Sequence, residues 1–502
     1  MSGSLEREVK FAGRPGFAMP DLSGVLPGVS VVGLPSLDLD ATYYDTADLR
    51  LVRSGVSLRR RTGEGPPTWT LKLPAGTSGS VLQRREFDIE SDATDVPVEL
   101  ARLVTGWARS EPLIAVIEIL SRRERFALVD SGGIDLAELD DDRVTVVEGG
   151  VTAATFREIE LELTDAGTDA LLGAVTAALR GAGAGAPDPM SKVARALGPR
   201  ALVPSMLEGP TPRRDASIAE VLAAGLRSAV AEMIANDHVI RLDDDSMGLH
   251  RARWALRRIR SDLKTFTSHF DDAYLDHLRT ELRWLSEEFG TLRRADVLVE
   301  SVEHATASAR DNDVAAVERL IDRARRERER AHASVIEILE SKRYIELLDL
   351  LVGATRPNAL FSGESAAAVE VIPTAMMRVW KRVRSAVGDM PEEPSENDIR
   401  HVRRQIIRLR SATELSVPVF GAAASDFAVL TAKAQHDLGV HLDALACERW
   451  LRSRVDSLEG LEPFVAGQLV SAQSVISDQA LRAWLESWRA CSKRSAVAWF
   501  RS

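Results

Sequence analysis

The chain has 502 residues, of which 45% are hydrophobic and 28% charged, a composition that excludes a disordered tail and favours two or more domains. The net charge of −11 excludes a general nucleic-acid coat, although arginines are dense in a few short segments. Two cysteines, Cys447 and Cys491, are too few for a disulfide framework or a thiolate metal site.

No basic segment followed by an apolar run opens the chain, and no apolar stretch approaches the length of about 18 residues that a membrane helix needs. We therefore expect a cytoplasmic protein without a membrane partner and without a specific nucleic-acid partner. Focal basic segments on an acidic protein suit a defined polyanion better than a long duplex.

Residues 1–202 contain short β-type runs separated by turn signals. In chain order they are LEREVKF, LDATYYD, VSLRRRT, TWTLKLP, QRREFDIE, LIAVIEILSRRERFALV, RVTVVEG and TFREIELELTD, followed by a helical stretch, DALLGAVTAALRGAG. About eight strands at short spacing predict an antiparallel sheet or a closed barrel.

Residues 203–215 contain three prolines and a glycine without periodicity, which predicts an interdomain linker. From 216 to 502, apolar residues recur at three- and four-residue spacing, which predicts a helical bundle. Two similar basic segments, LHRARWALRRIRSDLKTF and IRHVRRQIIRLRSATEL, predict an internal repeat in this bundle. The expected fold class is α+β with two domains, an eight-stranded antiparallel β-barrel and an all-α helical bundle.

Charged side chains stand at alternate positions in five of the predicted strands. They are Glu6, Glu8 and Lys10; Arg59 and Arg61; Glu86, Asp88 and Glu90; Arg123 and Arg125; and Glu158, Glu160 and Glu162. One such row is typical of a solvated sheet face, but alternate residues of a closed barrel face its lumen. Basic side chains hold phosphate oxygens and carboxylates hold Mg²⁺ or Mn²⁺, so the rows together predict a site for a polyanion with adjacent phosphates.

The pattern E-x-E-x-K, complete here as Glu6-Arg7-Glu8-Val9-Lys10, resembles the signature of the CYTH superfamily, the triphosphate tunnel metalloenzymes. Other family motifs follow in order. Arg59 and Arg61 match the motif L-R-x-R, Lys72 matches a lysine that the family carries on a strand, and Glu86 and Asp88 match an acidic strand. Glu158, Glu160 and Glu162 match the family's last acidic strand, and Lys192 matches a C-terminal lysine. Two positions depart from the usual pattern, since many members have Glu where Asp88 stands and some have Lys where Arg123 stands.

The resemblance implies a charged tunnel that hydrolyses a terminal phosphoryl group of inorganic triphosphate or polyphosphate, although some relatives make cyclic AMP or hydrolyse thiamine triphosphate. The implied metal ligands, for Mg²⁺ or Mn²⁺, are Glu6, Glu8, Glu86, Asp88, Glu158, Glu160 and Glu162. The implied catalytic phosphate contacts are Lys10, Arg59, Arg61, Lys72, Arg123, Arg125 and Lys192. Trp69 and Trp107 are the only tryptophans before residue 200, which favours a substrate without a base.

A second constellation lies in the first basic segment of the predicted bundle. His250, Arg253, Arg257, Arg260 and Lys264 fall within about 80° of one another around a helix. An ordinary solvated helix would carry acidic partners four residues away, but Asp262 is the only acid within 251–264. The unrelieved positive charge predicts an anionic partner.

This segment resembles the first signature of the CHAD domain, the conserved-histidine α-helical domain, through His250, Arg253, Arg257, Arg258 and Lys264. LRWLSEEFGTLRRADVL supports the resemblance, with Arg294 where Asp is usual. The second basic segment fits in two registers, one with Arg400 in the place of the histidine and one with His401 there. The family is associated with inorganic polyphosphate, so the resemblance implies a polyphosphate-binding face that also includes Arg260, Arg400, His401, Arg403, Arg404, Arg408 and Arg410.

Three hypotheses remain open. The first is a metal-dependent triphosphatase or polyphosphatase whose helical domain captures the chain. The second is a non-catalytic polyphosphate-binding protein that localises to polyphosphate granules. The third is a nucleotide-directed enzyme, either an adenylate cyclase or a thiamine triphosphatase.

Overall fold

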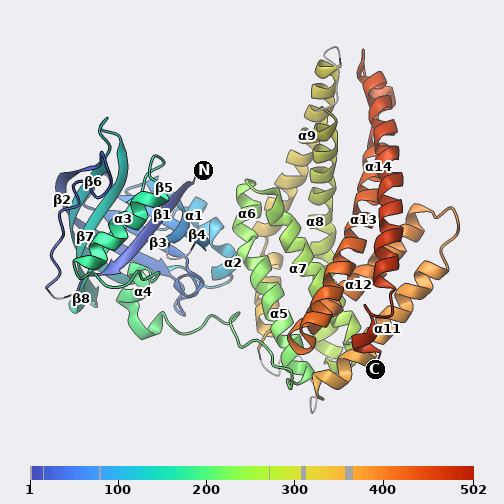
Figure 1. The fold of residues 1–502 in the computed structure, drawn as a ribbon, viewed down its shortest axis with the longest axis horizontal. Coiled ribbons are helices and arrows are strands. Elements are labelled where there is room, and N and C mark those ends of the chain that lie inside the picture. Colours follow the sequence, from blue (N-terminus) through green and yellow to red (C-terminus); the bar gives the residue numbers. More distant parts are fainter. Residues whose placement is uncertain are drawn as a thin grey trace. The chain divides into compact units, whose positions relative to one another are not determined.

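The computed structural model describes residues 3–14, 16–78, 81–270, 272–306, 313–356 and 366–501 (Figure 1). Contacts within the chain divide it into two units, Met1–Ser205 and Met206–Ser502. Residues 206–215 of the predicted linker belong to the second unit, where Leu207, Pro210 and Pro212 line a hollow beside three helices.

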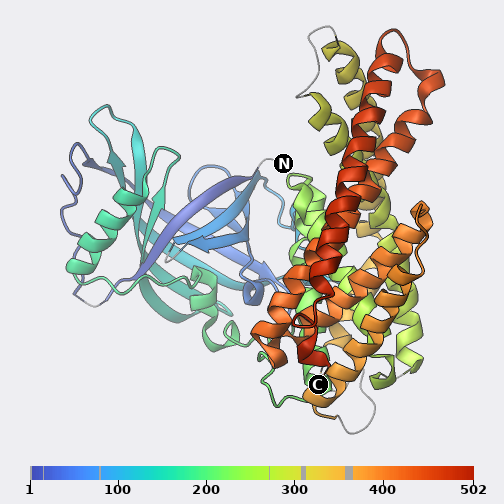
Figure 2. The same cartoon turned by 45° about the vertical axis from the view of Figure 1, so that its right-hand side comes forward.

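The first unit is a closed antiparallel barrel in the strand order β1-β5-β4-β3-β2-β6-β7-β8 (Figures 1 and 2). Its strands are β1 Ser4–Ala12, β2 Ser30–Asp45, β3 Ser57–Thr62, β4 Thr68–Ser78, β5 Val81–Glu90, β6 Ile114–Val129, β7 Asp135–Glu148 and β8 Val151–Leu163. Its helices are α1 Val98–Leu103, α2 Thr105–Ala108, α3 Asp169–Gly181 and α4 Lys192–Leu197. The predicted fold class is confirmed, and each predicted strand overlaps an observed one.

One of the two main apolar clusters of this unit lies outside the barrel wall. Val9 and Leu161, on the outer face of β1 and β8, pack beneath Leu171 and Val175 of α3 in one buried cluster. The side chain of Thr168 caps α3 by accepting a hydrogen bond from the Leu171 amide at 3.2 Å. Because successive residues of a strand point to opposite faces, covering this outer face turns the charged alternate positions into the lumen.

The lumen changes character along its length. At one end, inward-facing side chains of β6 and β7 pack with α4 in an apolar cluster that includes Ile117, Ile119, Val144, Val146, Val193 and Leu197. The same faces of the same strands carry charged side chains further along. The apolar cluster therefore confines the charged rows to the rest of the lumen.

The second unit is helical. Its helices are α5 Ile218–Ala235, α6 Asp237–Leu242, α7 Ser246–Thr265, α8 Asp272–Thr306, α9 Val314–Glu340, α10 Lys342–Ala354, α11 Ala368–Gly388, α12 Glu396–Phe420, α13 Ala422–Arg452 and α14 Glu462–Cys491. Two long pairs, α8 with α9 and α13 with α14, lie side by side in both views (Figures 1 and 2). The helices that carry the two basic segments, α7 and α12, pack against each other.

Within the described residues, no helix combines the length and the apolar character needed to cross a membrane.

Candidate functional site

The lumen of the barrel contains a cavity of about 190 Å³. Eight cationic side chains line it: Lys10, Arg59, Arg61, Lys72, Arg84, Arg123, Arg125 and Lys192. Seven carboxylates share the lining: Glu6, Glu64, Glu86, Glu138, Asp140, Glu160 and Glu162. Cations and carboxylates are nearly balanced, so the cavity offers partners both for phosphate oxygens and for divalent cations.

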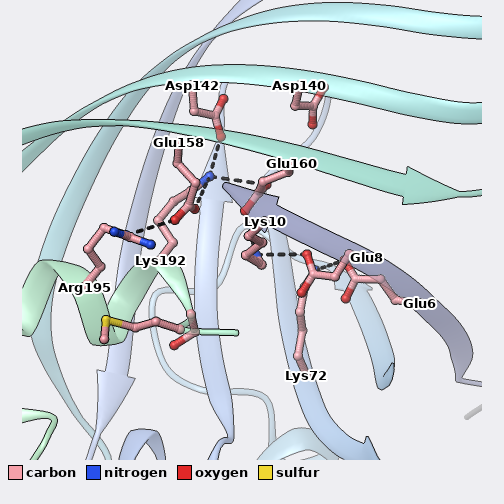
Figure 3. Close-up of polar contacts among 12 residues, drawn as sticks. Glu6, Glu8, Lys10, Lys72, Asp140, Asp142, Glu158, Glu160, Lys192 and Arg195 are labelled. Atoms are coloured by element: carbon pink, nitrogen blue, oxygen red, sulfur yellow. Dashed lines mark hydrogen bonds and ion pairs between the residues drawn. The ribbon is translucent and has the colours of Figure 1, made fainter. Parts of the chain in front are cut away.

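Lys10 lies between two carboxylates, as Figure 3 shows. Its Nζ is 2.9 Å from Glu8 Oε2 and donates to Glu160 Oε1 at 2.6 Å. The register of β1 against β8 sets this geometry, because Lys10 stands opposite Glu160 and Glu8 opposite Glu162. Burial by itself would lower the pKa of Lys10, but Glu160 and Glu8 raise it well above its usual value, so Lys10 stays charged.

Lys72 on β4 has the same role for a second set of carboxylates. Its Nζ donates to Glu6 Oε1 at 2.5 Å and is 3.3 Å from Glu86 Oε2. Burial, together with the Glu8 and Glu86 carboxylates, raises the pKa of Glu6 despite this lysine. Partial burial and the nearby Glu6 carboxylate raise the pKa of Glu162 to about 7. Around Lys72 the cavity therefore contains more carboxyl groups than this one lysine can neutralise.

Lys192 reaches the lumen from the first turn of α4. Ser191 caps that helix, with its Oγ accepting from the Ala194 amide at 3.2 Å. The Lys192 ammonium contacts Asp142 and is 3.4 Å from Glu160 Oε2 (Figure 3). Arg195, one turn later, donates to Glu158 Oε2 at 3.2 Å. The short helix thus brings two cations to the acidic rows of β7 and β8.

Arg123 makes the densest set of ion pairs in the lumen. Its Nε and Nη2 donate to both oxygens of Asp142 at 2.8 Å, and Nη2 also donates to Glu160 Oε2 at 3.1 Å. Its third partner is Asp140, whose pKa burial raises to about 8 even beside this arginine. A carboxyl with that pKa holds a proton over much of the neutral range.

Arg59 and Arg61 extend from β3 into the same cavity. Arg61 donates to Glu64 Oε2 at 2.9 Å, in the turn after the strand. That turn needs glycine, because Gly63 has a φ of +101° and a side chain there would meet the carbonyl oxygen of Asp38. The buried Nε of Arg59 has no hydrogen-bond partner in the described part of the chain. Arg59 therefore keeps a free donor for a ligand.

The donor set of the lumen fits a hard cation, but not in a preformed arrangement. Within the part of the chain that the structure describes, one buried oxygen each of Glu6, Glu8, Asp140 and Glu158 has no hydrogen-bond partner, and carboxylate oxygens are the ligands that Mg²⁺ and Mn²⁺ prefer. Among the described residues, however, no three His, Cys, Asp or Glu side chains are already grouped around one point. Lys10 and Lys72 neutralise Glu8 and Glu6 instead.

The structure brings together most of the residues predicted for the barrel. Thirteen of the predicted residues line the cavity or contact a side chain that does: Glu6, Glu8, Lys10, Arg59, Arg61, Lys72, Glu86, Arg123, Arg125, Glu158, Glu160, Glu162 and Lys192. Asp88 does not: it is exposed and accepts a hydrogen bond from Thr70 Oγ1 at 2.7 Å. The structure therefore separates Asp88 from the other predicted metal ligands.

Sequence reasoning missed a sixth charged row. Strand β7 begins at Asp135, not at Arg143, and its alternate residues Glu138, Asp140 and Asp142 face the lumen. The alternation was present in LAELDDD, but three consecutive aspartates are typical of a turn. Arg84, Glu64 and Tyr43 were also missed.

The helical unit contains a second cavity, of about 860 Å³, with a different charge balance. Nine arginines line it: Arg251, Arg253, Arg257, Arg258, Arg293, Arg294, Arg400, Arg403 and Arg410. Among the described residues, only three carboxylates do so, Glu232, Glu300 and Asp443, and two histidines, His250 and His436, complete the charged and titratable lining. We call this space the arginine cavity. Its strong excess of positive charge fits an anion without the help of a metal.

The crowding of these arginines is visible in their pKa values. Burial and the neighbouring Arg257 lower the pKa of Arg253 to about 9, and burial and Arg403 lower that of Arg257 to about 10. Desolvation, together with the nearby Arg293 and Arg257, also lowers the pKa of His250. Arg410 is held differently, with its guanidinium 3.9 Å from the ring centroid of Trp254. An anion that entered the cavity would relieve the repulsion.

The predicted polyphosphate-binding face is split by the structure. His250, Arg253, Arg257, Arg258, Arg400, Arg403 and Arg410 line the arginine cavity, whereas Arg260, Lys264, His401, Arg404 and Arg408 do not. Because Arg400 lines the cavity and the exposed His401 does not, the structure favours the register with Arg400 in the place of the histidine. Arg293, Arg294 and Asp443, on α8 and α13, were missed.

Comparison with protein families finds two matches. The CYTH domain model matches residues 4–197 and the CHAD domain model matches residues 224–452. Members of the CYTH family act as triphosphatases or cyclases on phosphoanhydrides, bind triphosphate substrates in the tunnel and are generally metal-dependent. The matched ranges include every described residue that lines the barrel cavity or the arginine cavity.

Parts of this chain are also similar to solved structures. Among solved structures, PptA from Streptomyces chartreusis is 19% identical over 55% of this chain and 100% of its own, with a TM-score of 0.46. The CHAD domain from the plant Ricinus communis is 20% identical over 58% of this chain and 95% of its own, also with a TM-score of 0.46. A putative adenylyl cyclase from Hippeastrum, described as having a dominant triphosphatase activity, is 17% identical over 38% of this chain and 95% of its own, with a TM-score of 0.25.

Two uncharacterized proteins from strains of Mycobacterium tuberculosis are each 33% identical to this chain over 427 residues, which is 81% of this chain and 81% of theirs. With a relative of that extent and both domain models matched in order, this chain belongs to the CYTH and CHAD families, as a CYTH domain followed by a CHAD domain.

Proposed function

We propose that this chain is a metal-dependent hydrolase of inorganic triphosphate or polyphosphate, and that its helical domain binds the polyphosphate chain. The observation that carries the proposal is the lining of the barrel cavity, where eight cations and seven carboxylates meet. Arginine and lysine suit phosphate oxygens, and carboxylates suit Mg²⁺ or Mn²⁺. A substrate with several adjacent phosphates uses both kinds of group.

In this proposal Arg59 and Arg61 bind phosphate oxygens, because Arg59 has an unused buried donor and both side chains line the cavity. Lys10 and Lys72 can turn from their carboxylates to phosphate oxygens, since an ammonium has three donors. The residues that would hold the metal are Glu6, Glu8, Glu86, Glu158, Glu160 and Glu162. A bound cation would supply charge neutralisation and an activated water.

The lining also favours a substrate without a base. Tyr43 is the one aromatic side chain among the described residues that line the barrel cavity. Trp69 is fully buried and donates from Nε1 to the carbonyl oxygen of Ala93 at 3.1 Å, away from the lumen. Among the described residues, only the buried Tyr43 offers the cavity an aromatic ring for stacking on an adenine or a thiamine ring, so inorganic triphosphate and polyphosphate fit the cavity better.

A specific observation favours a second candidate, a polyphosphate-binding protein without turnover. Lys10 and Lys72 already neutralise the carboxylates of β1, and the described residues contain no preformed metal cluster. In that case the arginine cavity would be the functional site, and it would bind the protein to polyphosphate granules.

One assay separates these candidates. Phosphate release is measured with tripolyphosphate, long-chain polyphosphate, ATP and thiamine triphosphate, each with Mg²⁺, Mn²⁺ or a chelator. The proposal predicts metal-dependent release from the inorganic substrates. Release from ATP or thiamine triphosphate alone would assign the nucleotide-directed alternative, and release from none would assign the binding protein.

A matched pair of variants on β3 tests the substrate-binding role of the lumen. Arg59→Gln should raise the KM for tripolyphosphate about 10-fold or more, because it removes one charged phosphate contact. Arg60→Gln, one residue along the same strand, is the control, since Arg60 donates to the Ala93 carbonyl outside the lumen. Equal KM values for the two variants would contradict the assignment of the lumen.

A further inference from the structure

Glu64 differs from the other carboxylates of the barrel cavity because it lies in a turn and not on a strand. Strand β3 ends at Thr62 and β4 begins at Thr68, and Glu64 lies between them. Its side chain nevertheless lines the cavity, beside cations that belong to two different strands. A carboxylate from outside the alternating rows of the strands therefore reaches the lumen.

Glu64 contacts both of these cations at once. Arg61 on β3 donates from Nη2 to Glu64 Oε2 at 2.9 Å, and Arg125 Nη1 on β6 is 3.5 Å from Glu64 Oε1. Within the described residues, Glu64 is the one carboxylate within 4.0 Å of an Arg61 nitrogen, whereas Arg125 also donates to Glu138 Oε1 at 2.7 Å. The two oxygens of one carboxylate thus occupy donors that a phosphate group would use.

These contacts lie in the more exposed part of the charged lumen. Along β6, the inward-facing residues run from Ile117 in the apolar cluster to Arg123 and then to Arg125. The side chain of Glu64 is 35% exposed and those of Arg61 and Arg125 are each 21% exposed, against 12% for Arg123. A ligand from solvent therefore reaches Glu64 and its two arginines more easily than the ion pairs of Arg123.

The backbone is held on both sides of Glu64. Gly63 has a φ of +101° and lies against the backbone of Asp38, where only glycine fits. Pro66 and Pro67 follow, and their rings restrict the backbone before β4 begins. The Cα of Glu64 therefore stays near the arginines, and the carboxylate can leave and return by rotation of its own side chain.

The contacts of Glu64 are of a kind that a phosphate group can replace. Ion pairs that solvent reaches are screened and contribute little to stability. Desolvation and the neighbouring Arg59 lower the pKa of Arg61, and Glu64 opposes this shift only in part. Arg61 therefore gains from an anion with more negative charge than one carboxylate, and a guanidinium matches phosphate oxygens with two parallel contacts.

We propose that Glu64 is an internal competitor for the substrate: in the free protein its carboxylate occupies donors of Arg61 and Arg125, and a phosphate group of the bound chain displaces it. This inference rests on the proposed binding of inorganic triphosphate or polyphosphate in the barrel, and it adds a residue that limits the affinity of the lumen. Because the displaced carboxylate stays close to the arginines, it competes with the products of hydrolysis as well and favours their release.

The test is equilibrium binding of tripolyphosphate to the full chain with a chelator present, measured by calorimetric titration. Glu64→Gln should bind tripolyphosphate about 3- to 10-fold more tightly than the unaltered chain, because the amide leaves both arginines to the ligand. A variant that fails to fold cannot bind more tightly, so a gain is not explained by lost structure. Glu148→Gln is the matched control, since Glu148 pairs with Arg200 at 2.9 Å and does not line the cavity.

Turnover with Mg²⁺ gives a second readout. In Glu64→Gln the KM for tripolyphosphate should fall by about the same factor while kcat does not rise, because the carboxylate opposes the bound substrate and the transition state alike. A KM that instead rises in the variant would show that Glu64 holds a metal or positions the arginines.

Two results of the binding experiment would also overturn the inference. An unchanged or weaker affinity in Glu64→Gln would show that the carboxylate does not compete with the ligand, and an equal gain in Glu148→Gln would show an effect of net charge alone. If the unaltered chain neither binds nor hydrolyses tripolyphosphate, the proposed function of the barrel fails as well. Binding by the unaltered chain without a gain in Glu64→Gln overturns only the role of Glu64.

Discussion

Ser411 on α12 donates a hydrogen bond from Oγ to Oδ1 of Asp262 on α7 at 2.8 Å, at the interface between the two basic helices. Burial raises the pKa of Asp262 to about 7, although Arg258 lies 3.9 Å from it. The pair is one of the contacts that hold α7 and α12 together, and both helices contribute arginines to the arginine cavity.

This pair gives the helical unit a predicted pH dependence. Between about pH 4 and pH 7, Asp262 has lost its proton in the unfolded chain but keeps it in the folded chain. The folded state therefore binds more protons than the unfolded state, and the free energy of unfolding falls as the pH rises through this range. Asp262→Asn keeps a partner for Ser411 and should remove this fall, which is on the order of 3 kcal/mol. Urea unfolding followed by circular dichroism at pH 4.5 and pH 8 checks it. The same pH dependence in the variant would contradict the assignment.

Arg253→Ala with Arg257→Ala should weaken polyphosphate binding and flatten its salt dependence, with tripolyphosphate hydrolysis in the barrel little affected. Both arginines line the cavity, and burial and like charges lower the pKa of each. For the same reason, the double variant should be more stable without ligand by on the order of 1 kcal/mol. An unchanged salt dependence, measured by titration at several ionic strengths, would show that these arginines do not contact the anion.

Asp443 on α13 is expected to oppose anion binding. It faces Arg403 on α12, Arg253 and Arg257 on α7, and Arg293 and Glu300 on α8, with His436 beside it on α13. Burial raises its pKa, so a lower pH protonates it and removes its repulsion of the anion.

Asp443→Asn should therefore raise polyphosphate affinity at neutral pH by about 3- to 10-fold. When the pH is lowered from about 8 to about 5, the affinity for polyphosphate should rise less in the variant than in the unaltered chain, because the variant has no carboxylate at position 443 to protonate. The histidines titrate in both proteins. Calorimetric titrations at both pH values measure this difference. A weaker affinity in the variant would mean that Asp443 positions the arginines instead.

Cutting the chain between the two units tests whether they share one substrate molecule. The cut belongs at 203–205, because Leu207, Pro210 and Pro212 line a hollow of the helical unit and should stay with it. If the helical unit feeds long chains to the barrel, the cut should raise the KM for long-chain polyphosphate and leave that for tripolyphosphate alone. Equal KM values before and after the cut would show that the fusion serves localisation.

Much of the architecture could be predicted from local sequence patterns, because strand alternation and turn residues act over a few residues. Glu6, Glu8 and Lys10 face the lumen as their spacing predicts. The row on β7 was hidden because Asp140, Asp141 and Asp142 are typical of a turn, and only pairing with β6 extends the strand to Asp135. Asp88 follows the alternation but is exposed, since alternation does not say how deep a residue lies.

The arginine cavity shows the same limit in the helical unit. A helical pattern predicts that α12 is basic, but its rotation depends on contacts such as that between Ser411 and Asp262. Hence His401 looked equivalent to Arg400, and only packing places Arg400 in the cavity. Asp443 stands alone in its segment of α13, so no local pattern marked it.

If the barrel is a metal-dependent hydrolase, the carboxylates of β1 support its turnover. This role is tested by comparing phosphate release from tripolyphosphate by the unaltered chain and by Glu6→Gln with Glu8→Gln, with Mg²⁺, Mn²⁺ or a chelator. Lys72 and Lys10 keep Glu86 and Glu160 as partners, so the variant should stay folded, which circular dichroism checks. In the unaltered chain, the chelator should abolish phosphate release. In the folded variant, release with metal should be at least about 100-fold lower than in the unaltered chain. Equal turnover by the folded variant would contradict a role of these carboxylates in metal-dependent hydrolysis.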